Sequence, residues 1–143
     1  TINNPNLHKH NAVFYSNRKR YQESCDDLTP DDIKMITSNI SIEDNENTLI
    51  FDYRNSLSKL DGVSDSALLV CLNILSHANV KNVVLAGFDG FTSCMEENFY
   101  QSDIAYLLDK NYIDNLNSTM ERNIKKYQEK MLIKTLTPSK NID

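Results

Sequence analysis

Residues able to bind an anionic, hydroxyl-rich ligand recur along this sequence of 143 residues. Arginine side chains bind phosphate or carboxylate groups through two parallel hydrogen bonds, and a carboxylate accepts hydrogen bonds from sugar hydroxyls. An acidic sugar or a nucleotide-sugar therefore fits these residue types better than an aliphatic or aromatic ligand. The candidate ligand-binding residues are Asn17, Arg18, Arg20, Asn39, Tyr53, Arg54, Ser64, Gly87 and Asp89.

Most of these candidates lie where a short apolar run ends. The clearest run is "KNVVLAGFDG" (81–90), in which a near-continuous apolar stretch leads into glycine and a carboxylate. Such runs are typical of strands buried on both faces of a parallel sheet. Residues 30–32 precede one of the runs and could equally begin a helix over 30–39. The predicted strands cover residues 11–17, 33–39, 47–55, 81–90 and 132–137.

The segments between the later strands have helical patterns. Residues 64–78 open with Ser64, Asp65 and Ser66, any of which could cap a helix, and are then apolar on almost every side. Residues 96–111 are a second helical candidate. Residues 118–131 are the clearest amphipathic segment, because Ser118 and Glu121 have the spacing of a capping box. One apolar stripe of this helix contains Met120, Ile124, Tyr127 and Met131.

This alternation of strands and helices predicts the fold class. Strands separated by helical segments are expected in a three-layer, Rossmann-like α/β fold with a mostly parallel sheet, here of about five strands. Right-handed crossovers would place helices on both faces of the sheet. We expect residues 11–143 to form a single domain and residues 1–10 to be a linker or tail.

The fold would bring the candidate residues together. Ligands of open parallel sheets bind beyond the carboxyl ends of the strands, near a switch in strand order. In a parallel sheet, the residues that follow each strand meet at one edge. The amino-terminal end of the helix over 64–78 would lie there too, and its free N–H groups favour an anion.

Each candidate also has a purely structural interpretation. Asp89 would cap a turn, and Gly87 would supply a backbone conformation that other residues avoid. Residues 18–20 would be the solvated start of a helix, Ser64 a helix cap and Tyr53 a half-buried packing residue. The sequence leaves both interpretations open.

Composition narrows the classes of partner. The net charge is −5 and the basic residues form no long stripe, so nucleic acid is not expected as a partner. No apolar run approaches the roughly 20 residues of a membrane span. The three cysteines show no C-x-x-C spacing, so we expect reduced thiols, a cytoplasmic location and neither a metal nor another cofactor. The chain begins with Thr1, and we expect it to be a piece of a longer protein.

Four segments carry a resemblance that spans residues 11–138: "FYSNRKRY", "SDSALLVCLNIL", "VKNVVLAGFDGF" and "IKTLTPS". Together they resemble the carboxy-terminal domain that follows an aldolase-type TIM barrel in some bacterial proteins of the HMG-CoA-lyase-like or 4-hydroxy-2-oxovalerate-aldolase-like family. Several of these proteins are associated with surface polysaccharide genes. The resemblance implies that an amino-terminal barrel holds the lyase chemistry and its divalent metal.

The chain is also distantly similar to Rossmann-like bacterial sialyltransferases. That similarity would place a nucleotide-sugar at the sheet edge, beside Asn17, Ser64, Gly87 and Asp89. Those transferases need a histidine downstream of the strand that reads "VVLAGFD", and this sequence has no histidine after His77. The fold can persist where that catalysis does not.

We therefore expect an accessory domain of an aldolase-like protein that binds an anionic sugar or nucleotide-sugar and is not catalytic by itself. One alternative is a glycosyltransferase-like enzyme in which Asp89 acts as the base. The other is a structural domain that docks to its barrel or to a second copy through the helix over 96–111 or 118–131.

Overall fold

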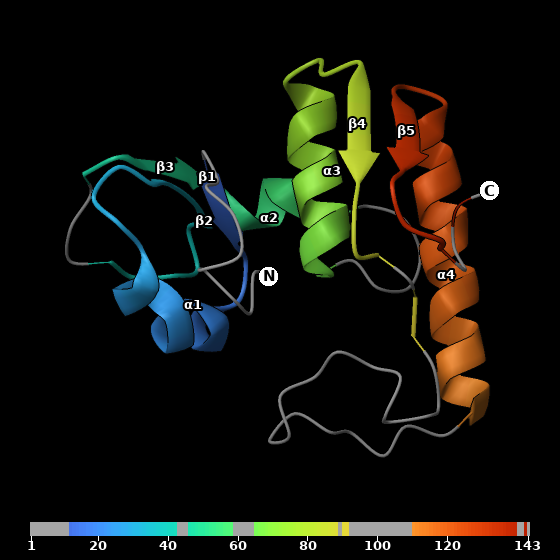
Figure 1. The fold of residues 1–143 in the computed structure, drawn as a ribbon, viewed down its shortest axis with the longest axis horizontal. Coiled ribbons are helices and arrows are strands. Elements are labelled where there is room, and N and C mark those ends of the chain that lie inside the picture. Colours follow the sequence, from blue (N-terminus) through green and yellow to red (C-terminus); the bar gives the residue numbers. More distant parts are fainter. Residues whose placement is uncertain are drawn as a thin grey trace. The chain divides into compact units, whose positions relative to one another are not determined.

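The computed structural model describes residues 12–42, 46–58, 65–88, 90–91, 110–139 and 142. These residues fall into two compact units (Figure 1). The first unit takes the chain as far as Ser58 and again from residue 65 to Ile74, and the second contains the described residues from Leu75 onward.

The first unit is built on three parallel strands, β1 (Ala12–Tyr15), β2 (Ile33–Thr37) and β3 (Thr48–Phe51), in the order β1-β2-β3. Tyr15 lies beside Ile36, and Ile36 lies beside Ile50. The first three predicted strands are thus confirmed as parallel strands. Residues 33–37 form a strand, which decides against the alternative helix over 30–39.

One face of this sheet forms the core of the first unit. Val13, Tyr15 and Ile36 alternate along their strands with residues of the other face and are almost completely buried, together with Ile40. Helix α1 (Arg18–Ser24) follows β1 directly, and its Tyr21 packs against this cluster. The rings of Tyr15 and Tyr21 meet edge to face, with centroids 5.4 Å apart. A single 3-10 turn, η1 (Cys25–Asp27), continues α1.

The chain leaves β3 earlier than predicted. The strand expected over 47–55 ends at Phe51, and a short helix, α2 (Tyr53–Ser56), follows it. Asp52 caps this helix, because its Oδ1 accepts a hydrogen bond from the backbone N–H of Asn55 at 2.8 Å. The chain therefore turns into a helix after Phe51 instead of continuing as a strand.

Helix α3 (Ala67–His77) confirms the predicted buried helix, with Leu69, Val70, Leu72 and Ile74 buried. Its Asn73 amide donates to the backbone carbonyls of Asn55, Ser56 and Leu57, each at 3.2 Å. These bonds satisfy the carbonyl groups at the end of α2 and attach α2 to α3 within the first unit.

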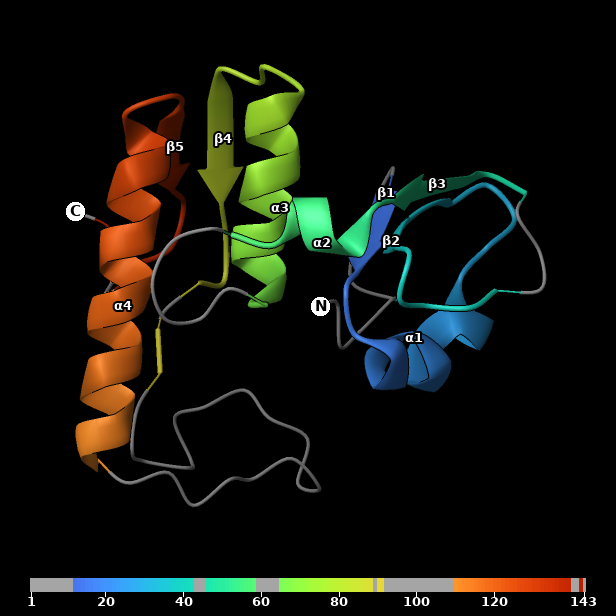
Figure 2. The same cartoon turned by 180° about the vertical axis from the view of Figure 1, so that it is seen from behind.

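The second unit contains a parallel pair of strands, β4 (Asn82–Leu85) and β5 (Leu132–Thr135). They confirm strands within the predicted ranges 81–90 and 132–137, although both end earlier than predicted. Helix α4 (Lys110–Gln128) runs alongside β5, as both ribbon views show (Figures 1 and 2). The predicted apolar stripe of this helix is buried, since Met120, Ile124 and Tyr127 are each at most 4% exposed. None of the described helices is both long and apolar enough to cross a membrane.

The predicted start of α4 is wrong. Ser118 lies in the middle of the helix and donates its hydroxyl hydrogen to the backbone carbonyl of Asp114 at 2.8 Å. Glu121 pairs with Lys125, one turn further on, at 2.6 Å. The capping-box spacing is therefore coincidental, because these side chains find other partners within a continuous helix. The helix predicted over 96–111 lies outside the described residues except for its last two, which belong to α4.

The structure thus shows a mixed α/β protein whose described strands form two short parallel sheets, of three and two strands.

Candidate functional site

The residues that follow β1, β2 and β3 form a connected polar layer, which we call the carboxyl edge. It consists of Ser16, Asn17, Ser38, Asn39, Asp52 and Tyr53. The backbone N–H of Ser38 donates to the carbonyl of Phe51 at 2.8 Å, and the Ser38 hydroxyl oxygen accepts from the backbone N–H of Tyr53 at 3.0 Å. These bonds join the end of β2 to the end of β3.

A second pair of bonds joins the end of β2 to the end of β1. The Asn39 side-chain amide donates to the carbonyl of Ser16 at 3.1 Å. Its Oδ1 accepts a hydrogen bond of 2.6 Å from the Thr37 hydroxyl. Asn39, predicted as a ligand contact, therefore has both ends of its side chain engaged in holding this edge together.

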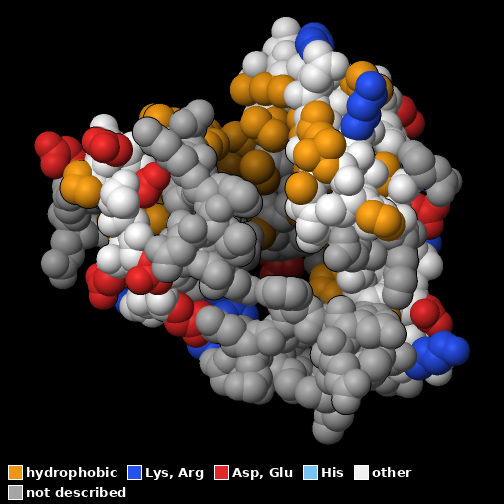
Figure 3. Space-filling view, in the orientation of Figure 1, with side chains coloured by type: hydrophobic (Ala, Val, Ile, Leu, Met, Phe, Trp, Pro, Cys, Tyr) orange, Lys and Arg blue, Asp and Glu red, His pale blue; other side chains and the backbone are white. Residues whose placement is uncertain are grey.

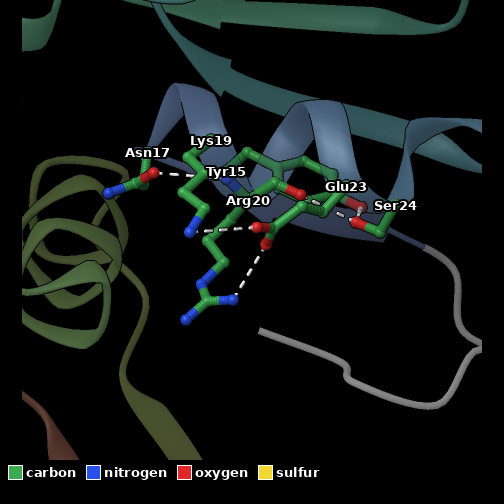
Figure 4. Close-up of polar contacts among 6 residues, drawn as sticks. All are labelled: Tyr15, Asn17, Lys19, Arg20, Glu23 and Ser24. Atoms are coloured by element: carbon green, nitrogen blue, oxygen red, sulfur yellow. Dashed lines mark hydrogen bonds and ion pairs between the residues drawn. The ribbon is translucent and has the colours of Figure 1, made fainter. Parts of the chain in front are cut away.

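Asn17 begins α1 in the same way that Asp52 begins α2. Its Oδ1 accepts a hydrogen bond of 3.2 Å from the backbone N–H of Arg20, which makes it the cap of the helix (Figure 4). The side chain is exposed, and no described residue accepts a hydrogen bond from its Nδ2. The helix cap therefore uses the Oδ1 of Asn17, whereas a ligand would contact its Nδ2.

The basic residues of α1 differ in how they are paired. Arg20 Nη1 lies 2.8 Å from Glu23 Oε2, and Lys19 Nζ lies 3.5 Å from Glu23 Oε1 (Figure 4). Arg18 is exposed and forms no ion pair within the described part of the chain. Of the two arginines predicted here, Arg18 is thus the one whose guanidinium lacks a carboxylate partner among these residues.

Tyr15 holds α1 against the sheet. Ser24 donates its hydroxyl hydrogen to the carbonyl of Arg20 at 3.0 Å, so the Tyr15 hydroxyl donates to Ser24 Oγ at 2.8 Å (Figure 4). Burial raises the pKa of Tyr15 above its ordinary value, and the hydrogen bond to Ser24 opposes part of that rise. A buried, hydrogen-bonded phenol suits a structural role.

Tyr53 and Arg54 lie in the first turn of α2. Tyr53 is half-buried, and its backbone N–H is the group bonded to Ser38. Arg54 is exposed and makes no ion pair with any residue that the structure describes. Asp52 was not among the residues predicted from the sequence, although an aspartate directly before a helical turn is a typical helix cap.

Gly87 belongs to the second unit, where it follows β4. Its φ of +68° lies in the left-handed region, and a Cβ built there would meet nothing within 4 Å. The glycine is thus explained by backbone conformation and not by lack of room. Its N–H donates to Thr137 Oγ1 at 3.0 Å, which connects the ends of β4 and β5. Ser64 and Asp89 lie outside the described residues.

The structure therefore brings six of the nine predicted site residues into the first unit: Asn17, Arg18, Arg20, Asn39, Tyr53 and Arg54.

The described residues contain no group of three side chains able to hold a metal ion. Cys25 and Cys71 are free thiols. Burial raises the pKa of both, and the neighbouring carboxylate of Asp26 adds to the rise at Cys25. Thiols with raised pKa values are poor nucleophiles at neutral pH.

No family model, curated protein or solved structure matches this chain. What the chain does must therefore be inferred from the geometry of the carboxyl edge and from the sequence resemblance.

Proposed function

We propose that this chain is an accessory domain of an aldolase-like bacterial protein and that it binds an anionic sugar or nucleotide-sugar at the carboxyl edge. The observation that carries the proposal is the pair Arg18 and Arg54. Both are exposed, both follow strands of one parallel sheet, and neither forms an ion pair within the described structure. Exposed guanidinium groups of this kind are suited to phosphate or carboxylate.

The spacing of the strands supports a shared ligand. β1 and β3 are separated by β2 alone, so their ends are two strand spacings, about 10 Å, apart. Arginine side chains are long enough to approach one phosphate or carboxylate from both sides across that distance. Between them, the exposed Nδ2 of Asn17 and the hydroxyl group of Ser38 offer contacts to sugar hydroxyls.

We also propose that the five strands form one mostly parallel sheet of a three-layer, Rossmann-like domain. The second unit supports it. Val84 and Leu132 share one face of the β4–β5 pair with Asn82 and Lys134 and are 56% and 52% exposed, whereas Ile133 on the other face is buried. The space-filling view shows exposed hydrophobic side chains gathered on part of the surface (Figure 3). Parallel sheets ordinarily have both faces covered, so the exposed apolar side chains of Val84 and Leu132 suit a further layer.

In that fold, Ser64 would join the site from the start of the helix over 64–78, and Gly87 and Asp89 from the end of the fourth strand. Asp89 would accept hydrogen bonds from sugar hydroxyls, and Gly87 would allow the backbone to approach the ligand. By resemblance, the catalytic residues and the divalent metal belong to an amino-terminal barrel of the parent protein, which would act in the cytoplasm.

Thermal unfolding in the presence of nucleotides, nucleotide-sugars and acidic sugars tests this function. A ligand that binds only the folded state raises the melting temperature. We expect one class of anionic sugar compound to do so, and the rise to disappear in the Arg18→Gln/Arg54→Gln double variant. The Asp89→Ala variant should also lose it.

Arg122→Gln is the matched control. Arg122 is an exposed arginine of α4 in the second unit, and its guanidinium donates to Thr119 Oγ1 at 3.1 Å. It should retain the full ligand-induced shift. A shift that survives the double variant, or no shift with any compound, would contradict binding at the carboxyl edge.

A second candidate is an assembly domain, which docks to its barrel or to another copy. The observation that favours it is the set of exposed apolar side chains, of which Leu49 and Ile50 on β3 are 52% and 55% exposed. The third candidate is a glycosyltransferase-like enzyme with Asp89 as its base; it requires turnover of the bound compound, and loss of that turnover in Asp89→Asn.

A further inference from the structure

Asp52 is the acidic residue of the carboxyl edge, and hydrogen bonds hold both its backbone and its side chain. Its two neighbours in the sequence bond to Ser38, since the Phe51 carbonyl accepts from the Ser38 N–H at 2.8 Å and the Tyr53 N–H donates to the Ser38 hydroxyl oxygen at 3.0 Å. Asp52 Oδ1 accepts from the N–H of Asn55 at 2.8 Å. The carboxylate is therefore held in place before any ligand binds, which reduces the entropy lost on binding.

The second carboxylate oxygen of Asp52, Oδ2, is available to a ligand. The residue is exposed, and no described residue donates a hydrogen bond to Oδ2. Capping of α2 requires only Oδ1. Because a carboxylate can only accept hydrogen bonds, the partner of Oδ2 must be a donor such as a hydroxyl group.

The charges at the carboxyl edge favour a ligand with a single anionic group. Arg18 and Arg54 are exposed and form no ion pair within the described part of the chain. The carboxylate of Asp52 offsets one of these two positive charges. A sugar acid has one negative charge, which matches the remaining positive charge, whereas the diphosphate of a nucleotide-sugar has more than one.

We propose that Asp52 selects a sugar acid as the ligand of the carboxyl edge: Oδ2 accepts a hydrogen bond from a ring hydroxyl group, while Arg18 and Arg54 bind the carboxylate of the sugar. This inference rests on the proposed function and names its ligand class. The ends of β2 and β3 are about 5 Å apart, so a carboxylate bound between the two arginines, near the end of β2, would lie within the length of one sugar ring of Asp52. A site that hydrogen-bonds a hydroxyl group discriminates against an analogue that lacks it.

Asp52→Ser tests the proposal, because serine also caps helices but has no second oxygen to offer a ligand. The two probes are D-glucuronate and tetrahydropyran-2-carboxylate, which has the same ring and carboxylate without the hydroxyl groups. Amide NMR shifts at the carboxyl edge give the dissociation constant of each probe. For glucuronate we expect this constant to rise about tenfold, which corresponds to about 1.4 kcal/mol. For the analogue it should stay the same or fall, because a charge that repels the anion is removed.

Three further variants serve as comparisons. Asp52→Asn also keeps a capping oxygen, and its amide can donate to a hydroxyl oxygen without the help of a charge, so it should weaken glucuronate binding less than serine does. Asp31→Ser is the matched control, because Asp31 is exposed and lies at the amino-terminal end of β2; it should change neither dissociation constant. The Arg18→Gln/Arg54→Gln double variant should weaken the binding of both probes.

The outcomes separate this inference from the proposed function. If Asp52→Ser weakened the binding of both probes or of neither, or if the wild type bound both equally well, Asp52 would not select for sugar hydroxyl groups, although the edge could still bind an anion. If nucleotide-sugars raised the melting temperature of the wild type and glucuronate did not bind, the inferred ligand class would be wrong and the proposed function would stand. Failure of every anionic sugar compound to bind would overturn both.

Discussion

The Asn17 side chain has two polar atoms, and its structural role uses one of them. Asn17→Ala removes the cap of α1 and should lower the free energy of unfolding by about 1 kcal/mol. Asn17→Ser retains a capping oxygen but lacks the amide group, so it should keep most of that stability and still weaken ligand binding. Urea denaturation and titration with the ligand, applied to both variants, separate the two roles. If serine restored stability and binding together, Asn17 would be a helix cap alone.

Tyr15 should make stability depend on pH in the alkaline range. Burial holds its pKa in the folded state above the value near 10 of the unfolded state, so the folded state favours the neutral phenol. The stability that depends on this neutral form is fully present below about pH 10 and is lost as pH rises through the pKa of the folded state.

Denaturation of the wild type and of Tyr15→Phe, at neutral pH and again above pH 10, measures that contribution. Phenylalanine keeps the ring and cannot ionise. The variant should therefore lose less stability than the wild type between the two conditions. Equal losses would show that Tyr15 is not the residue responsible.

At the residue scale, the sequence indicates which side chains follow the strands but not which of them are already engaged in hydrogen bonds or ion pairs. Asn39 has the residue type of a ligand contact, yet it joins the ends of β1 and β2. Arg20 is paired with Glu23, three residues further along the same helix. That spacing was visible in the sequence, whereas the pairing of Asn39 depends on which strand becomes its neighbour.

In helix α4, the sign of the stability change caused by Ser118→Ala distinguishes a capping serine from one in the helix interior. Were Ser118 the helix cap, as its spacing from Glu121 predicts, Ser118→Ala would cost about 1 kcal/mol. Because Ser118 lies in the helix interior, alanine should instead raise the free energy of unfolding by up to about 0.5 kcal/mol. Thermal or urea denaturation measures the difference, and a clear destabilisation would contradict the observed start of the helix.

At the scale of elements, the strands could be predicted because each is a short apolar run bounded by polar residues. The short helix α2 could not, because four residues carry no periodic signal and their conformation depends on the cap at Asp52 and on Asn73. The helix over 64–78 was predictable from its apolar character on every side. The start of α4 was not predictable, because the three-residue spacing of Ser118 and Glu121 fits both a helix cap and a turn in the helix interior.

At the scale of the whole chain, the prediction of a single domain can be tested by cooperativity. Ile36 in the first unit and Ile124 in the second are both completely buried. Ile36→Ala or Ile124→Ala should lower the free energy of unfolding by about 2–5 kcal/mol. If residues 11–143 unfold as one domain, each variant should show a single transition at a lower denaturant concentration. Two transitions, of which each variant moves only one, would mean that the units fold independently.

The measurement that tests the central claim most directly is the change in amide NMR shifts of the chain when it is titrated with the compound that stabilises it most. Binding at the carboxyl edge predicts that the largest changes lie in residues 16–18, 38–39 and 52–55, with little change at the opposite ends of β1, β2 and β3. Changes confined to α4 or to the start of the strands would contradict the account and place the ligand elsewhere.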